Sequence, residues 1–128
     1  TRSAFVTGVQ TCALPILIKE AGGVPSLAHP IIVGASDYRL DLDRLLPVMV
    51  ESGLDGIEAY YKGYTPEITA FLFGLASRYR LVATGGSDFH GGGVVADAEL
   101  GAVEVPWETV ERLRDRQRRP GYAPDGRR

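Results

Sequence analysis

The sequence predicts an α/β fold in which parallel strands alternate with helices. Three short apolar segments, at about residues 24–28, 55–60 and 81–84, have the composition of buried strands. A helix-like pattern separates each segment from the next, so the strand–helix units are roughly thirty residues long. Units of this size are typical of a parallel sheet or an α/β barrel. In both architectures, ligands bind at the C-terminal ends of the strands.

The composition is that of an ordinary globular protein, either a single domain or part of a larger one. The chain has 128 residues, of which 45% are hydrophobic. Its one cysteine, Cys12, excludes an internal disulfide and fits a reducing compartment, so we expect a cytoplasmic protein. No apolar run reaches the roughly 18 residues of a membrane-spanning helix. We therefore expect no membrane association, and nothing in the composition indicates a particular protein partner.

The first residues do not resemble the start of a domain. Residues 1–16 have no hydrophobic period, and Pro15 interrupts their one apolar cluster. The stretch 5–16 resembles translated sequencing-adapter read-through, which would be excluded from fold reasoning. The alternative is a genuine irregular arm. We therefore expect a non-native or irregular segment over 1–16, a folded part over 17–118 and a disordered tail over 119–128.

Helix and turn signals fill the intervals in the first half of the chain. Residues 17–21 have the pattern of a helix end, which the following pair of glycines stops. A loop is expected over 31–39. A helix is then expected over about 42–51, with Asp41 as its N-cap. Pro47 lies inside that helix and would either kink it or mark its first turn.

The third predicted helix has the clearest start signal. Thr65 can cap it, and Pro66 occupies the first helical position, where its missing N–H costs nothing. The apolar face of this helix continues to Arg80. A further strand is expected over 101–105 and a last helix over 107–118. The inward face of that last helix is expected to consist of Val110, Leu113 and Gln117.

The charge is unevenly distributed. Seven arginines and two aspartates lie from Arg112 to the end, whereas residues 1–111 carry seven basic and fourteen acidic side chains. An arginine-rich end can bind an anionic partner such as RNA. The commoner interpretation is a solvated last helix followed by a frayed tail.

A carboxylate and an imidazole follow the third predicted strand. An extended backbone would place Asp88 and His90 on the same side. Carboxylate and neutral imidazole together suit Zn, Mn or Fe. Asp-x-His also occurs by chance, and in the simpler interpretation Asp88 caps backbone amides while His90 lies on the surface.

Two other strand ends favour the metal interpretation. Both histidines of the chain fall at C-terminal strand ends, since His29 ends the first predicted strand and His90 follows the third. Glu58 lies near the end of the second. Because these ends meet at one edge of a parallel sheet, we predict a metal site there. Glu58 is either part of that site or a plain structural salt bridge.

These residues lie in three segments, Gly22–Pro30, Gly53–Tyr61 and Thr84–Gly91. The segments resemble the C-terminal motifs of the PHP (polymerase and histidinol phosphatase) metallophosphoesterases. Within that family the sequence is most similar to the bacterial branch that hydrolyses nucleoside 3′,5′-bisphosphates and trims short RNA from its 5′ end. The resemblance covers about residues 17–118.

The resemblance implies the C-terminal part of a distorted (β/α)₇ barrel with a centre of several Mn, Fe or Zn ions. The family's N-terminal His-x-His motif and its next His and Glu ligands have no counterpart here. The resemblance implies that His29, Asp88 and His90 are metal ligands, with Asp88 and His90 in catalytic roles. By position alone, base or phosphate contacts are expected from Tyr60, Tyr61 and Lys62, and a place beside the metal site from Glu58.

The function implied for the intact protein is metal-dependent hydrolysis of phosphate esters in nucleotides or short RNA. The 128-residue chain itself is expected to have little or no activity. Its three ligands cannot complete a multinuclear site, and a half-barrel leaves strand edges unpaired. One alternative is a non-catalytic PHP-like structural module, and another is an amidohydrolase-type metal hydrolase.

Overall fold

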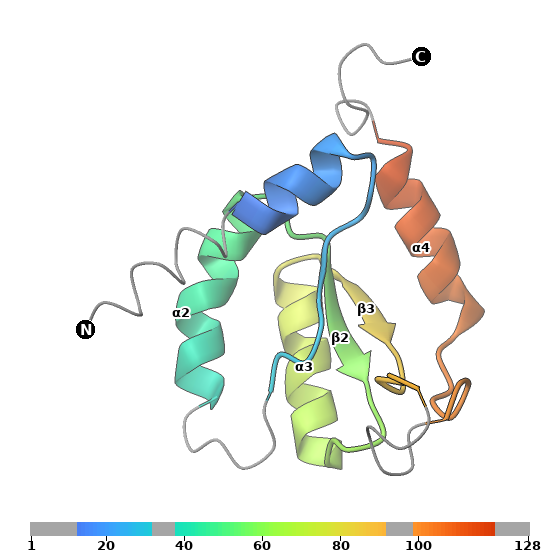
Figure 1. Cartoon of the computed structure of the whole chain (residues 1–128). Coiled ribbons are helices and arrows are strands. Elements are labelled where there is room, and N and C mark those ends of the chain that lie inside the picture. Colours follow the sequence, from blue (N-terminus) through green and yellow to red (C-terminus); the bar gives the residue numbers. More distant parts are fainter. Residues whose placement is uncertain (1–12, 32–37, 92–98, 120–128) are drawn as a thin grey trace.

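A computed structural model describes residues 13–31, 38–91 and 99–119. Helices and strands alternate along most of these residues, as predicted (Figure 1). None of the described helices is both long and apolar enough to cross a membrane. The elements in chain order are a helix over residues 13–20, β1 (Ser26–Leu27), α2 (Tyr38–Glu51), β2 (Gly56–Tyr60), α3 (Pro66–Arg78), β3 (Val82–Gly85) and α4 (Trp107–Gln117).

The three strands form one parallel sheet in the order β1-β2-β3. Gly56 of β2 is in register with Ser26 on one side and Val82 on the other. The arrows of β2 and β3 point to the same edge of the sheet (Figure 1). The parallel α/β class is therefore confirmed. Over the described residues the sheet is open, so the barrel implied by the resemblance stays a prediction.

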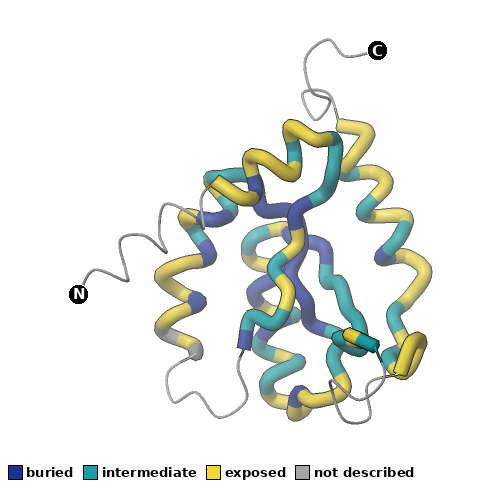
Figure 2. Tube along the Cα trace, in the orientation of Figure 1, coloured by how far each residue is buried: buried dark blue, intermediate teal, exposed yellow. Residues whose placement is uncertain are grey.

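The hydrophobic core lies where α2 and α3 pack against β2. Leu46, Ile57 and Leu72, one from each element, are completely buried. Figure 2 shows β2 as the most continuously buried part of the chain, with exposed residues on the outer sides of the helices. The same cluster includes Ile31, Leu42, Met49, Leu54, Ala59, Tyr64, Leu75, Ala76 and Leu81.

A bulge in β2 directs the side chains of Glu58 and Tyr60 to different neighbours. Glu58 pairs with Thr84, but Tyr60 pairs with the next residue of β3, Gly85. The extra residue turns the strand locally, as bulges do. Tyr60 consequently packs edge-on against Phe73 of α3, with ring centroids 5.0 Å apart. The carboxylate of Glu58 instead faces the loop after β1.

The start of α3 is confirmed in detail. Thr65 has an extended backbone and its Oγ1 accepts a hydrogen bond from the Ile68 N–H at 3.3 Å. Pro66 is the first helical residue. The helix ends at Arg78, two residues before the predicted end at Arg80.

The predicted start of the second helix was wrong. Helix α2 begins at Tyr38, so Asp41 lies in its first turn and is not the N-cap. Pro47 is inside the helix and does not mark its first turn. It leaves the carbonyl of Asp43 without its helical donor. Burial of Leu46 and Met49 on either side offsets that loss. Most of the loop predicted over 31–39 lies outside the described residues.

Other predicted boundaries also differ. The first strand is only two residues long, and its Ser26 is exposed. Residues 101–105 are not a strand, because Gly101 adopts a left-handed φ of 77° in a turn. That turn is closed by the Ala102 N–H, which donates to the Glu99 carbonyl at 3.1 Å. The described part of the N-terminal helix, residues 13–20, overlaps the segment predicted to be irregular. Whether residues 1–16 are native stays a prediction.

Helix α4 contacts the sheet through polar groups in addition to its half-buried apolar residues. Its one buried residue is Thr109, whose Oγ1 donates to the Ala83 carbonyl at 3.2 Å. Val110 and Leu113 are only half-buried. Gln117 is exposed, although its side chain donates to the Gly22 carbonyl at 2.9 Å.

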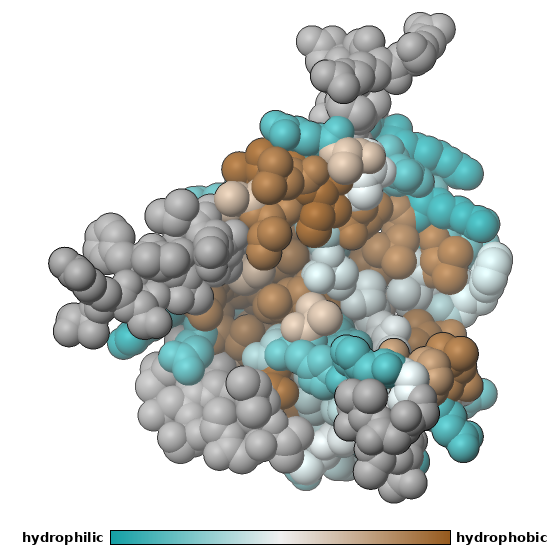
Figure 3. Space-filling model, in the orientation of Figure 1, coloured by the Kyte–Doolittle hydropathy of each residue, from teal (hydrophilic) through white to brown (hydrophobic). Residues whose placement is uncertain are grey.

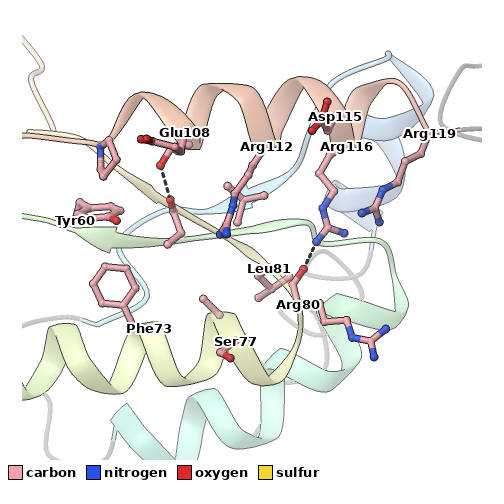
Figure 4. Close-up of a pocket in the computed structure, with 15 residues that line it drawn as sticks. Tyr60, Phe73, Ser77, Arg80, Leu81, Glu108, Arg112, Asp115, Arg116 and Arg119 are labelled. Carbon is pink, nitrogen blue, oxygen red and sulfur yellow. Dashed lines mark hydrogen bonds between the residues drawn. The ribbon is translucent and has the colours of Figure 1, made fainter.

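Asp55 joins most of these elements at the N-terminal edge of the sheet. Its carboxylate lies 3.0 Å from Lys19 Nζ and 3.2 Å from Arg116 Nη1. Its N–H donates to the Pro25 carbonyl at 3.0 Å, and its own carbonyl accepts from Val82 at 2.8 Å. Arg116 also donates to the carbonyl of Arg80 (Figure 4). This one buried residue therefore connects the N-terminal helix, all three strands and α4.

Replacing Asp55 by alanine should destabilise the fold by about 3 kcal/mol, because the buried guanidinium of Arg116 would lose its carboxylate partner. Urea unfolding at neutral pH measures this change. Asp115→Ala is the matched control, since Asp115 forms only an exposed pair with Arg118 at 3.9 Å. The control should change stability by less than about 0.5 kcal/mol. Equal effects of the two variants would contradict the proposed importance of Asp55.

A glycine in the middle strand allows a contact across the sheet. Ser26 Oγ and Thr84 Oγ1, from the two outer strands, lie 2.8 Å apart over Gly56. A Cβ on Gly56 would lie 2.6 Å from Ser26 Oγ and 3.3 Å from Thr84 Cγ2. Gly56→Ala should therefore cost about 1–3 kcal/mol. Gly74→Ala should instead stabilise by about 0.5–1 kcal/mol, since Gly74 is inside α3 and a Cβ there meets nothing within 4 Å. Thermal unfolding of the two variants compares them directly.

Candidate metal centre

His29 and Asp88 meet at the C-terminal edge of the sheet. His29 follows β1 and Asp88 follows β3, so the strand that separates them in the sheet is β2. The Nε2 atom of His29 lies 3.0 Å from Asp88 Oδ2. Imidazole nitrogen and carboxylate oxygen are thus brought together by the parallel arrangement that the sequence predicted.

The surroundings of His29 hold its ring and leave its Nε2 available. The His29 N–H donates to Glu58 Oε2 at 2.8 Å. Tyr61 packs edge-on against the imidazole, with ring centroids 4.8 Å apart. His29 Nε2 is buried and has no aligned hydrogen bond within the described part of the chain, despite its closeness to Asp88. A buried ring nitrogen that takes part in no aligned hydrogen bond is suited to bind a cation.

The Asp88–His90 pair is arranged by a turn and not by a strand. Asp88 has a left-handed φ of 57°, so the extended backbone expected for Asp-x-His is not formed. His90 Nδ1 lies 2.6 Å from the Asp88 carbonyl oxygen and 3.5 Å from its Oδ1. Contact of Nδ1 with a backbone carbonyl is a common way to orient a histidine whose Nε2 is the ligand. The His90 side chain is 57% exposed, against 28% for Asp88.

Left-handed backbone occurs at both strand-end residues. Among the described residues other than glycine, only His29, Arg80 and Asp88 have positive φ, at 46°, 55° and 57°. Such a conformation costs about 1–3 kcal/mol per residue and clusters at functional sites. The two turns that carry His29 and Asp88 are therefore held in place by contacts around them.

The residues present fit part of a divalent-metal site. Two imidazoles and a carboxylate are ligands suited to Mn, Fe or Zn. No group of three or more His, Cys, Asp or Glu side chains among residues 13–31, 38–91 and 99–119 is arranged to hold an ion by itself. His29 and Asp88 form a candidate ligand pair, and His90 lies beside it with its Nδ1 against the Asp88 carbonyl.

The residues predicted to contact substrate do not all point the same way. Tyr61 lies at the site, against His29. Tyr60 points away, into a groove of about 690 Å³ between α3 and α4 that also contains Phe73 and Arg112 (Figure 4). Lys62 is exposed and lines a shallow hollow of about 290 Å³ together with Tyr61. Tyr60 also lines this hollow, but of these three residues Tyr61 is the one whose ring packs against His29.

Tyr64 is a neighbour of the site that the sequence reasoning missed. It packs edge-on against Tyr61 at 5.0 Å and is buried in the core. Its hydroxyl has no hydrogen-bond partner among the described residues. Burial has the largest effect and raises the pKa of the Tyr64 phenol to about 12; the Ile31 backbone, which lies near the hydroxyl without an aligned hydrogen bond, lowers the pKa, and the charge of Glu58 raises it by a smaller amount. The spacing Tyr61-x-x-Tyr64 was the available signal for this aromatic contact.

The raised pKa predicts a loss of stability at alkaline pH. The neutral phenol is favoured in the folded state, so this contribution is complete below pH 10 and is lost between pH 10 and about 12. Tyr64→Phe should remove that part of the pH dependence, since phenylalanine has no ionisable group. Urea unfolding between pH 8 and pH 11 measures it, with Tyr79→Phe as the control. An unchanged alkaline slope in Tyr64→Phe would contradict the assignment.

Comparisons with known proteins point to phosphoesterases. No protein-family model matches the sequence. Over 75 residues, or 59% of this chain, it is 47% identical to a phosphoribosyl 1,2-cyclic phosphate 1,2-diphosphodiesterase of Eggerthella lenta. The fold is similar to the crystal structure of a protein of Bifidobacterium adolescentis described as a metal-dependent phosphoesterase, with a TM-score of 0.68 and 33% identity over 83% of this chain.

The matched parts are segments of longer proteins. The chain spans 26% of the Eggerthella relative and 36% of the Bifidobacterium protein. The similarity in sequence and the similarity in fold are both well above the level at which only a general architecture is shared. These similarities to a phosphodiesterase and to a metal-dependent phosphoesterase support the resemblance to the PHP family.

Proposed function

We propose that this chain supplies part of a divalent-metal centre that hydrolyses phosphate esters of phosphorylated small molecules. The observation that carries the proposal is the 3.0 Å approach of His29 Nε2 to Asp88 Oδ2 at the C-terminal edge of the sheet. The two relatives, a phosphodiesterase and a metal-dependent phosphoesterase, support it.

The chemistry depends on ions that these residues would hold together with further ligands. A bound divalent ion lowers the pKa of water and neutralises charge on phosphate oxygens. His29 and Asp88 would hold such an ion, and His90 would join them by turning its Nε2 toward it. The family does not fix which metal is used, and Mn, Fe and Zn all suit this donor set.

The substrate class that we propose is a phosphate ester on ribose. The family resemblance favours nucleoside 3′,5′-bisphosphates or short RNA. The 47% identity to a phosphoribosyl cyclic-phosphate diesterase favours a cyclic phosphate of ribose as the second candidate. Tyr61 and Lys62 border a hollow of about 290 Å³ beside the site, and an aromatic ring with a cation suits a phosphorylated sugar in either case.

Two other functions are less well supported. A non-catalytic module gives no reason to bury His29 Nε2 beside Asp88 with no aligned hydrogen bond to the described residues, since such an atom costs stability. An amidohydrolase shares the donor types, but both matched proteins act on phosphate esters by their descriptions. We therefore retain phosphoester hydrolysis as the conclusion.

Metal affinity tests the proposed centre without requiring turnover. His29→Ala and Asp88→Asn should each weaken Mn²⁺ or Zn²⁺ binding by at least about tenfold, because a lost ligand costs no less than a lost outer partner. Isothermal titration of the metal into the chain gives the affinities, with Asp115→Asn as the exposed control. Wild-type affinity in both variants would rule out a His29–Asp88 centre.

Turnover separates the substrate candidates. The 128-residue chain should show little hydrolysis of a 3′,5′-bisphosphonucleotide, a 5′-phosphorylated short RNA or a phosphoribosyl 1,2-cyclic phosphate with Mn²⁺. A longer protein containing this segment should hydrolyse one of them, and its His29→Ala variant should not. Robust turnover by the chain alone, lost in Asp88→Ala, would contradict the view that its ligand set is incomplete. Unchanged turnover in His29→Ala would favour the non-catalytic role for this edge.

A further inference from the structure

We propose that Glu58 is a positioning residue that holds His29 in the conformation needed for metal binding, without being a ligand itself. This inference rests on the proposed function, since it concerns the same site. It makes specific the place beside the metal site that was expected for Glu58, because the role proposed acts through the backbone of His29.

The direct contact is between a buried side chain and a main-chain amide. Glu58 is 8% exposed, and its Oε2 accepts the His29 N–H at 2.8 Å. Hydrogen bonds from an amide to an ionised carboxylate are shorter and stronger than those between neutral groups. Glu58 is part of the rigid, buried strand β2, whereas His29 lies in a loop. The contact therefore fixes the loop to the strand.

The backbone of His29 needs such a restraint. Its φ of 46° is in the left-handed region, which a residue with a side chain adopts only when its surroundings impose it. Rotation of φ back to a negative value would swing the amide away from Glu58 and move the imidazole away from Asp88. The same hydrogen bond thus sets the direction of His29 Nε2.

Glu58 also lies close to the loop that carries Asp88. A Cβ built on Gly86 would lie 3.6 Å from Glu58 Oε1, so the backbone after β3 passes beside this carboxylate. Glu58 therefore stands between the loops of the two candidate ligands, with one oxygen directed to each. A side chain in this place can set the spacing between His29 and Asp88.

The salt-bridge interpretation is not supported. The ion pairs among the described residues involve Asp55, Asp88 and Asp115, and none involves Glu58. The charge of Glu58 is instead balanced by the hydrogen bond to the His29 amide. One carboxylate oxygen of Glu58 is therefore engaged by the His29 amide, which is the contact that a positioning role requires.

Two substitutions of Glu58 distinguish the possible roles. Glu58→Gln keeps an oxygen acceptor of the same reach but loses the charge, whereas Glu58→Ala loses both. Loss of a partner behind a ligand typically weakens metal binding by about 10–100-fold. We expect that weakening of Zn²⁺ affinity in Glu58→Ala, and affinity within about threefold of wild type in Glu58→Gln. Competition with a chromophoric chelator measures both, with Glu51→Ala, at the exposed end of α2, as the control.

The outcomes are distinct. If Glu58 were a metal ligand, Glu58→Gln would lose affinity as far as Glu58→Ala. If its role were only structural, both variants would keep wild-type Zn²⁺ affinity and differ only in urea unfolding. Either result overturns the proposal.

A metal-free measurement separates this proposal from the proposed function. In the ¹H–¹⁵N spectrum of the full chain without metal, the His29 amide proton should resonate far downfield in wild type and in Glu58→Gln. It should move upfield in Glu58→Ala, together with the His29 ring signals. Failure of the wild-type chain to bind Zn²⁺ would count against the metal centre alone. Unchanged His29 signals in Glu58→Ala would overturn the positioning role whatever the metal result.

Discussion

The fold depends on a buried carboxylate at the N-terminal edge of the sheet. Asp55 receives Lys19 from the N-terminal helix and Arg116 from α4, while its backbone bonds to the segments that enter β1 and β3. A buried ion pair does not by itself guarantee stability, because desolvation opposes the attraction. What Asp55 provides is alignment, since one side chain determines where two helices lie relative to three strands.

The two edges of the sheet have opposite properties. At the Asp55 edge the carboxylate is paired with Lys19 and Arg116, and among non-glycine residues there only Arg80 has a left-handed backbone. At the other edge, His29 and Asp88 have left-handed backbones and His29 Nε2 has no aligned partner among the described residues. Strand β2 connects these edges. Its Glu58 accepts a hydrogen bond from the His29 amide, so the loop of His29 is attached to the buried core. The left-handed backbones of His29 and Asp88 persist because the core to which their loops are attached is fixed.

The open sheet and the exposed apolar residues belong together. Figure 3 shows apolar surface gathered over the helix of residues 13–20, where Leu14 and Leu17 are more than half exposed. The matched relatives are three to four times longer than the segment that this chain spans in them.

The sequence by itself determined the parallel α/β class, the cap of α3 and the meeting of His29 with Asp88. These depend on period, on capping chemistry and on the rule that parallel strands end at one edge, all of which are local or topological. Only the tertiary structure decided that Tyr60 turns away, that Tyr64 lies behind Tyr61 and that Glu58 reaches the His29 amide. Those contacts depend on a one-residue bulge in β2 and on left-handed turns, which sequence period does not reveal. The same limit explains why α4 meets the sheet through Thr109 and Arg116, since its partners lie far away along the chain.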